Sequence, residues 1–147
     1  HIYSAAAPIS VDLLKWFDRL GIRIMQALGM TEDCVYAHFE RPYARKMGSV
    51  GKPMDGMLVK ITEDGELRVK TPSNTIGYYK EPQLTAELFD EEGYLKTGDM
   101  VEYDHDGFLF VTGRVKDLFK TDKGKYIAPT PIETKILANS DVENTCV

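Results

Sequence analysis

Two short segments of this 147-residue chain contain side chains that could do chemistry. Gly29-Met30-Thr31-Glu32 offers a hydroxyl and a carboxylate to a phosphate and its Mg²⁺, because hard cations take oxygen ligands. Lys96-Thr97-Gly98-Asp99 could aim a carboxylate at a sugar diol, which donates two hydrogen bonds. Each segment also has an ordinary interpretation, because a single Gly-x-Thr-Glu is weak evidence and many surface turns contain Gly-Asp.

A third segment, Gly113 to Pro129, is basic although the chain has a formal net charge of -5. Its cations alternate with apolar residues: Arg114, Lys116, Lys120, Lys123 and Lys125. Clustered cations could hold an anionic ligand. Lysines also protect the solvated edge of a hairpin, and this second interpretation is the more common one.

The N-terminal part predicts a strand, helix, strand unit. Ser10 can cap a helix whose apolar residues recur at helical spacing from Val11 to Leu20, and Gly21 can end it. The β-prone runs HIYSAA and IRIMQAL flank this helix, which indicates an α/β sheet. The small residues from Ser4 to Pro8 could let a flat ligand approach the backbone, although the residues alone favour a turn. Gly29 to Glu32 would follow a strand end, where ligands collect in open α/β sheets.

From Gly56 onward, the chain alternates in short β-prone runs. LVKI and ELRVK are joined through Asp64-Gly65, which supports a tight hairpin. A short helix at 82–89 interrupts the strands, after which MVEY pairs with FLFV and DLFKT pairs with KYIAP. Thr130-Pro131-Ile132-Glu133 has the pattern of a capping box and predicts a last helix that ends near Ala138.

Composition narrows the possible functions. A pI near 5.2 argues against a general nucleic-acid surface, since phosphate binding depends on excess Lys and Arg. No apolar run approaches the length of a bilayer span and the N-terminus lacks the pattern of a signal peptide, so we expect a cytoplasmic chain. Cys34 and Cys146 lack CxxC spacing, and we expect two ordinary buried or half-buried thiols. The chain starts at His1 and stops without a polar tail, which indicates a fragment.

Taken in order, five motifs resemble the successive core motifs of the adenylate-forming superfamily, which contains acyl-CoA synthetases, peptide-synthetase adenylation domains and luciferases. They are SAAAPIS, GMTED, GELRVKTPSNTIGYYKEPQLTAELF, GYLKTGDM and GRVKDLFKTDKGKYIAPTPIE. An ordered series is far more specific than any one short motif. The last motif most resembles AMP-forming long-chain fatty-acid CoA ligases.

The resemblance implies a mixed α/β and β-rich fold. Residues 1–55 would be the α/β end piece of a large N-terminal domain, and residues 56–115 its distorted β-barrel subdomain. Residues 116–147 would be the hinge and the truncated start of a small C-terminal lid. The activity it implies is ATP-dependent activation of a carboxylic acid as acyl-AMP, followed by transfer to CoA, with ATP, Mg²⁺ and CoA as ligands.

The resemblance also implies roles for single residues. Thr31 would contact the adenylate phosphate, and Glu32 would hold Mg²⁺ against ATP. Asp99 would bind the ribose hydroxyls. Arg114 would contact the ribose and help neutralise the reacting carboxylate or phosphate, because the planar guanidinium donates paired hydrogen bonds to such anions. The nucleotide-binding set implied by the resemblance is Ala5, Ala6, Leu28, Gly29, Thr31, Asp99 and Arg114.

The same resemblance places the hinge at Lys116, and hinges absorb large backbone changes at a few positions. The lid would take one pose to make acyl-AMP and a second in which the CoA thiol attacks. Lys120 and Gly124 would face the active site in the second pose, and Lys120 would be catalytic there. Lys123 and Lys125 would be solvated turn residues or would meet CoA phosphates.

The chain departs from the family pattern at several points. Leu28 stands where an adenine-stacking aromatic is usual, and Ala5 replaces a common glycine. The Ser/Thr/Gly-rich phosphate loop and the adenylation lysine near the C-terminus are absent from the sequence, so we expect that the chain cannot make acyl-AMP alone. Two alternatives stay open: an adenylate-forming enzyme that loads a carrier-protein thiol, and a noncatalytic module. The intact parent could be membrane-peripheral or form a homo-oligomer.

Overall fold

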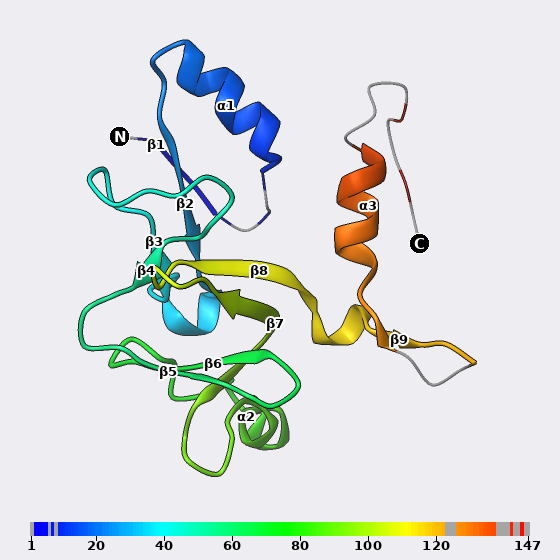
Figure 1. Ribbon diagram of the computed structural model, residues 1–147. Coiled ribbons are helices and arrows are strands. Elements are labelled where there is room, and N and C mark those ends of the chain that lie inside the picture. Colours follow the sequence, from blue (N-terminus) through cyan, green and yellow to red (C-terminus); the bar gives the residue numbers. More distant parts are fainter. Residues whose placement is uncertain are drawn as a thin grey trace.

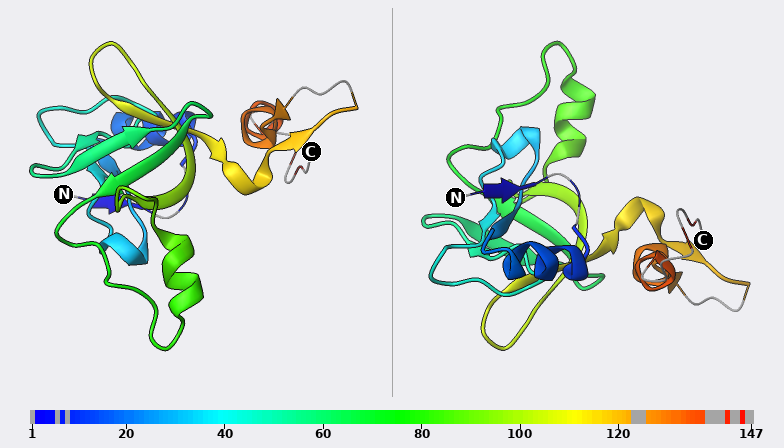
Figure 2. Two further views of the ribbon diagram at one scale, coloured as in Figure 1. Left: turned by 90° about the horizontal axis from the view of Figure 1, so that it is seen from below. Right: turned by 90° about the horizontal axis from the view of Figure 1, so that it is seen from above.

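The computed structural model describes residues 2–5, 7, 9–122, 126–137, 142 and 145. Its elements form two four-stranded sheets and a separate C-terminal hairpin with a helix (Figures 1 and 2). The predicted mixed α/β and β-rich fold is confirmed. None of the described helices has the length and apolarity that crossing a bilayer requires.

The predicted strand, helix, strand unit is present at the N-terminus. It consists of β1 (Ile2–Ser4), α1 (Val11–Arg19) and β2 (Ile24–Leu28), and the two strands pair in parallel. Ser10 caps α1, because its Oγ accepts a hydrogen bond from the Leu13 amide at 3.2 Å. Gly21 turns the chain with a φ of +77°, a conformation that favours glycine.

The first sheet continues through two short strands. It has the order β1-β2-β3-β4, where β3 is His38–Phe39 and β4 is Lys52–Pro53. A one-turn 3-10 helix, η1 (Thr31–Asp33), lies between β2 and β3. The sheet therefore positions η1 directly after the carboxyl end of β2, as predicted for this segment.

The second sheet is fully antiparallel. It contains β5 (Leu58–Ile61), β6 (Glu66–Lys70), β7 (Leu95–Tyr103) and β8 (Leu109–Arg114) in sequential order, and α2 (Pro82–Leu88) precedes β7. This sheet is open, so the expected barrel is not closed in the described part of the chain. The reason is that β5 and β8 form opposite edges. Leu109 on the β8 edge instead forms two backbone hydrogen bonds of 2.9 Å with residues 50 and 51, which directly precede β4 of the first sheet.

The hydrophobic core lies between these two sheets. Leu67, Val69 and Leu95 are fully buried at its centre, because alternate side chains of β6 and β7 point to one face. Leu28 and Met30 pack against this core from the end of β2 and the start of η1. The core thus holds η1 against the second sheet.

The C-terminal part lies apart from the two sheets in the views of Figures 1 and 2. It contains η2 (Val115–Asp117), the antiparallel pair β9 (Phe119–Lys120) and β10 (Tyr126–Ile127), and α3 (Pro129–Leu137). α3 contacts β8, where Gly113 lies close to Ala128 and Thr130. The predicted last helix is present: it begins at Pro129, one residue before the predicted cap residue Thr130, and the described part ends at Leu137.

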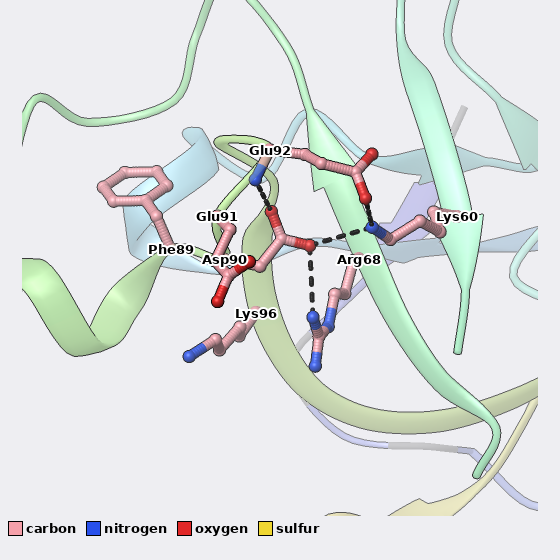
Figure 3. A pocket seen from close by; sticks show the side chains of 7 residues that line it. All are labelled: Lys60, Arg68, Phe89, Asp90, Glu91, Glu92 and Lys96. Carbon is pink, nitrogen blue, oxygen red and sulfur yellow. Dashed lines mark hydrogen bonds and ion pairs between the residues drawn. The ribbon is translucent and has the colours of Figure 1, made fainter. Parts of the chain in front are cut away.

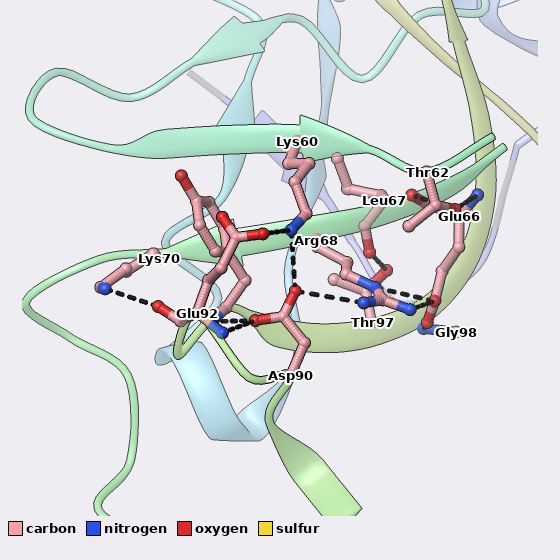
Figure 4. Close-up of polar contacts among 11 residues, drawn as sticks. Lys60, Thr62, Glu66, Leu67, Arg68, Lys70, Asp90, Glu92, Thr97 and Gly98 are labelled. Atoms are coloured by element: carbon pink, nitrogen blue, oxygen red, sulfur yellow. Dashed lines mark hydrogen bonds and ion pairs between the residues drawn. The ribbon is translucent and has the colours of Figure 1, made fainter.

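A polar clamp fastens the turn before β7 to the β5–β6 hairpin, as Figures 3 and 4 show. Asp90 Oδ2 accepts from Lys60 Nζ and from an Arg68 nitrogen, each at 3.1 Å. Asp90 Oδ1 accepts from the backbone amides of Glu92 at 3.0 Å and Tyr94 at 2.9 Å. One carboxylate therefore fixes the path of the chain into β7.

Candidate active site

Gly29 permits an unusually close packing of the chain at the start of the site. A Cβ atom on Gly29 would lie 2.5 Å from the Cα of Val35, a distance that real Cβ atoms do not reach. Only glycine therefore lets the chain fold back after η1. This folding presents Thr31 as an exposed residue and Glu32 as a half-buried one.

The backbone after η1 is strained. Cys34 and Val35 have φ values of 57° and 55°, and the left-handed region is unusual for a β-branched residue such as Val35. Hydrogen bonds from the Val35 amide to the Met30 carbonyl and from the Tyr36 amide to the Asp33 carbonyl hold this turn. Cys34 is exposed on it, so the expectation of a buried or half-buried thiol is wrong at this position.

Asp33 is a site-adjacent acid that the sequence did not single out. Its Oδ1 accepts from the Met30 amide at 2.9 Å, which closes the turn. Its Oδ2 is buried and has no hydrogen-bond partner in the described part of the chain. Burial raises the pKa of this carboxyl above its ordinary value, although backbone amides partly offset the effect.

The Thr97-Gly98-Asp99 segment lies inside β7, so its interpretation as a surface turn is wrong. The strand pairing is irregular here, with a register shift opposite Glu66 and Arg68 and a φ of +70° at Gly98. Thr97 Oγ1 donates to the Leu67 carbonyl at 2.7 Å and accepts from the Asp99 amide at 3.1 Å. These bonds fix the backbone on both sides of Gly98.

Asp99 and Arg114 form the charged pair of the site. They are direct cross-strand partners on β7 and β8, and Arg114 Nε lies 2.8 Å from Asp99 Oδ1. Asp99 is buried, whereas Arg114 is exposed. Burial raises the pKa of the Asp99 carboxyl and Arg114 opposes that rise. The carboxylate of Asp99 thus holds the guanidinium of Arg114 from the neighbouring strand.

The structure brings the β2–η1 turn and the β7–β8 pair together. The negative charges of Asp33 and Glu66 are among the causes that raise the pKa of Asp99, and they act only over short distances. Glu66 also accepts a hydrogen bond from the Gly98 amide at 3.2 Å. Glu66 belongs to one of the sequence motifs, but the sequence indicates no role for it. Its hydrogen bond to Gly98 forms only because β6 pairs with β7.

The remaining predicted site residues lie at different places. Ala5 follows β1 as an exposed residue, and Leu28 ends β2 half-buried. Lys116 is exposed on η2, and Lys120 is exposed on β9, which Figure 1 shows on the far side of η2 from η1. Ala6 and Gly124 lie outside the described residues, as do Lys123, Lys125 and Cys146.

A recess beside the polar clamp, shown in Figure 3, is not part of this site. It is lined by Phe89 and by three cations and three anions: Lys60, Arg68, Lys96, Asp90, Glu91 and Glu92. Lys60 also lies 2.8 Å from Glu92, and Arg68 lies 3.1 Å from Glu66. Because Lys60, Arg68, Asp90 and Glu92 pair with one another, we interpret the recess as the outside of a structural clamp.

The residues of η1 fit a magnesium ion held mainly by a nucleotide. No group of three or more His, Cys, Asp or Glu side chains in the described ranges could hold a metal by itself. Mg²⁺, however, is usually bound through one or two carboxylates together with substrate phosphates. Glu32 has one such carboxylate, and its Oε1 accepts a hydrogen bond from Tyr78. The neighbouring Thr31 adds a hydroxyl.

A family model described as "AMP-binding enzyme" matches residues 1–79, more than half of the chain. The chain belongs to the AMP-binding enzyme family. Its predicted membership of the adenylate-forming superfamily, with the acyl-CoA synthetases, is thereby confirmed.

Named relatives agree with this family. The fadD11 protein of Mycobacterium tuberculosis, which carries the name of a fatty-acid–CoA ligase, is 43% identical over 135 residues; these cover 92% of this chain and 24% of that protein. Acyl-CoA synthetase 7 of Caenorhabditis elegans is 37% identical over 154 residues, covering 97% and 28%. This AMP-binding chain therefore spans about a quarter of the length of the curated relatives it matches.

Solved structures give the same fold. The o-succinylbenzoate CoA synthetase of Bacillus subtilis in complex with its acyl-adenylate intermediate has a TM-score of 0.85 at 31% identity, covering 97% of this chain and 31% of that one. The same enzyme in complex with ATP and magnesium ion has a TM-score of 0.84 at 30% identity, covering 97% and 32%.

Proposed function

We propose that this AMP-binding chain is a segment of an ATP-dependent, AMP-forming acid:CoA ligase that activates a long-chain fatty acid. The Asp99–Arg114 pair is the observation that carries the proposal, because a buried carboxylate there holds an exposed guanidinium. The charge of Asp33 on η1 is among the causes that raise the pKa of Asp99, which supports a site shared with η1. The names of the relatives support the acyl-CoA product.

In the proposed reaction, the acid's carboxylate oxygen attacks the α-phosphorus of ATP and pyrophosphate leaves. The CoA thiol then attacks the acyl carbon and AMP leaves. Asp99 Oδ2 would accept a hydrogen bond from a ribose hydroxyl, and Arg114, held by Asp99 Oδ1, would direct its remaining N–H donors at the ribose or the reacting anion. Both groups act by fixed charge rather than as nucleophiles.

η1 would serve the phosphates. Thr31 would donate its hydroxyl to the adenylate phosphate, and Glu32 would hold Mg²⁺ through Oε2, the carboxylate oxygen that Tyr78 does not contact in the Tyr78–Glu32 hydrogen bond. When bound, Mg²⁺ would neutralise charge on the leaving pyrophosphate. Ala5, Leu28 and Gly29 would border the adenine, where Leu28 offers apolar contact instead of aromatic stacking.

The lid assignment is part of the same proposal. The division into 1–55, 56–115 and 116–147 would place the hinge at Lys116 and Lys120 at the thioester-forming face. Gly124 and Ala6 keep their predicted roles, but they lie outside the described residues. We propose a cytoplasmic enzyme whose intact form could be membrane-peripheral or oligomeric, with no nucleic acid among its partners.

The experiment is acid-dependent ATP–pyrophosphate exchange on the full-length protein, over a panel of fatty-acid chain lengths. Asp99→Asn should weaken ATP binding about 10- to 100-fold, because a hydrogen bond to a charged group is worth roughly 1.5–3 kcal/mol. Glu102→Gln is the matched control, since Glu102 is an exposed acid on the same strand. Exchange that is unaffected by Asp99→Asn would refute the ribose assignment.

Further variants separate the alternatives. Lys116→Pro should retain exchange but lose CoA-thioester formation, because only the second step needs the hinge. Thioester formation on a carrier protein but not on CoA would support the carrier-loading enzyme. Absence of exchange with every acid would support the noncatalytic module.

A further inference from the structure

Tyr78 and Glu32 are joined by a hydrogen bond, although they lie 46 residues apart in the chain. The Tyr78 hydroxyl donates to Glu32 Oε1 at 2.5 Å. Tyr78 lies in the loop before α2, and Glu32 lies on η1. This bond links the loop before α2 to η1.

The same loop also holds the backbone of η1. The Thr75 amide donates to the Glu32 carbonyl at 2.6 Å, and Ser73 Oγ donates to the Asp33 carbonyl at 2.9 Å. Two main-chain carbonyls and one side chain of η1 are thus fixed from residues 73–78. Of these three bonds, only the one from Tyr78 reaches a carboxylate, the side chain of Glu32.

Tyr78 is itself held firmly by α2. Its amide donates to Thr85 Oγ1 at 2.9 Å, and the Thr85 hydroxyl donates to the Glu81 carbonyl at 2.8 Å. Gly77 makes this possible, because a Cβ there would lie 2.3 Å from Thr85 Cγ2. Its φ of +139° is also one that L side chains rarely adopt.

We propose that Tyr78 is a positioning residue that sets the orientation of Glu32 for the metal–nucleotide complex. The inference rests on the proposed function, because it assumes that Glu32 holds Mg²⁺ beside ATP. The phenol contacts Oε1 and would fix the carboxylate plane, so that Oε2 would be the oxygen offered to the ion. Hydrogen-bonded partners of this kind typically tune metal affinity or activity 10- to 100-fold.

The exposure of Tyr78 also suits it to this task. Its relative exposure is 40%, so the hydroxyl adds little to the core. A tyrosine that only filled space would not need the hydroxyl that contacts Glu32.

The test uses the full-length protein and two tyrosine variants. Tyr78→Phe removes only the hydroxyl, and Tyr79→Phe is the matched control, because Tyr79 is 86% exposed and has no hydrogen bond to a described residue. The first readout is Mn²⁺ binding in the presence of ATP without acid, measured by electron paramagnetic resonance. Tyr78→Phe should weaken it about 10-fold, while Tyr79→Phe should change it less than twofold.

The second readout is the Mg²⁺ dependence of ATP–pyrophosphate exchange. Tyr78→Phe should raise the half-saturating Mg²⁺ concentration about 10-fold, and saturating Mg²⁺ should restore the maximal rate to within threefold. Loss of folded protein would lower the maximal rate without moving the midpoint. Thr85→Val, which removes the anchor of the Tyr78 amide, should move the midpoint in the same direction by a smaller factor.

The outcomes are distinguishable. If Tyr78→Phe binds Mn²⁺ with ATP as tightly as the wild type, the inference is wrong while the proposed function stands. If the wild type binds no Mn²⁺ with ATP, the inference and the metal assignment to Glu32 both fail. If the wild type binds the complex but exchanges no pyrophosphate with any acid, the proposed ligase fails, and the Mn²⁺ affinity of Tyr78→Phe still decides the inference.

Discussion

The polar clamp at Asp90 gives a prediction whose size follows from its contacts. Asp90→Asn keeps Oδ1 and its two backbone amides but replaces Oδ2 with an NH₂ group that faces two cations. A hydrogen bond to a charged group contributes roughly 1.5–3 kcal/mol. Lys60 and Arg68 each keep a second carboxylate, so we expect Asp90→Asn to lower the free energy of unfolding by about 2 kcal/mol.

Asp90→Ala should cost more, because it also removes the acceptor of the Glu92 and Tyr94 amides. These amides contribute about 1 kcal/mol each, which brings the expected loss to about 4 kcal/mol. The matched control is Glu91→Gln, which removes one negative charge from the same turn at an exposed residue without a hydrogen bond to a described residue. It should stay within about 0.5 kcal/mol of the wild type.

The assay is urea denaturation followed by circular dichroism, with amide hydrogen exchange at residues 92 and 94. The pKa of Asp90 lies well below its ordinary value because backbone amides and two cations favour the carboxylate. The stabilisation is therefore present above pH 4 and is lost only as the pH falls below the unfolded-state value. Equal unfolding free energies for Asp90→Asn and Asp90→Ala, or an effect of Glu91→Gln as large as theirs, would refute the clamp.

Three further predictions concern Gly29, His38 and Asp33. Gly29→Ala should lower the free energy of unfolding by about 3 kcal/mol in urea titrations, because the added Cβ would clash with the backbone of Val35. Gly56→Ala is the control: its Cβ would meet open space, and its φ of +80° alone should lower the free energy of unfolding by about 1 kcal/mol. Burial lowers the pKa of His38 to about 4, so the unfolding free energy should fall by about 3 kcal/mol between pH 6.5 and 4 relative to His38→Gln. Asp33→Asn should raise the unfolding free energy by about 1 kcal/mol at pH 8, and the difference should disappear in acid as the raised-pKa carboxyl of Asp33 becomes neutral.

The parts of the fold that could be predicted from sequence are those whose causes are local. Helix α1 has its cap at Ser10, its apolar period and its stop at Gly21 within a dozen residues, and the structure confirms all three. The β5–β6 hairpin likewise depends on the Asp64-Gly65 turn, where Gly65 has a φ of +91°.

The start of β7 could not be predicted, because it depends on residues of β6 that lie far away in the sequence. Gly98 within the segment is typical of a turn, yet the segment is a strand because β6 pairs with it and Glu66 accepts from the Gly98 amide. The motif order identified Asp99 and Arg114 as site residues, and the structure adds that they face each other. The contact of Tyr78 with Glu32 could not be predicted from the sequence, because the two residues lie 46 positions apart and meet only when the loop before α2 folds onto η1.

The position of Arg114 explains how the cations of the basic segment can have different roles in the proposed ligase. Arg114 is the last residue of β8 and is paired with Asp99, whereas Lys116 lies on η2 and Lys120 on β9. A rotation that begins at residue 115 or later moves β9 and leaves the Asp99–Arg114 pair intact. A hinge placed before Arg114 would separate the guanidinium from a buried carboxylate, which is costly. The clustered cations are therefore better understood as one fixed nucleotide contact followed by a movable arm than as a single anion-binding surface.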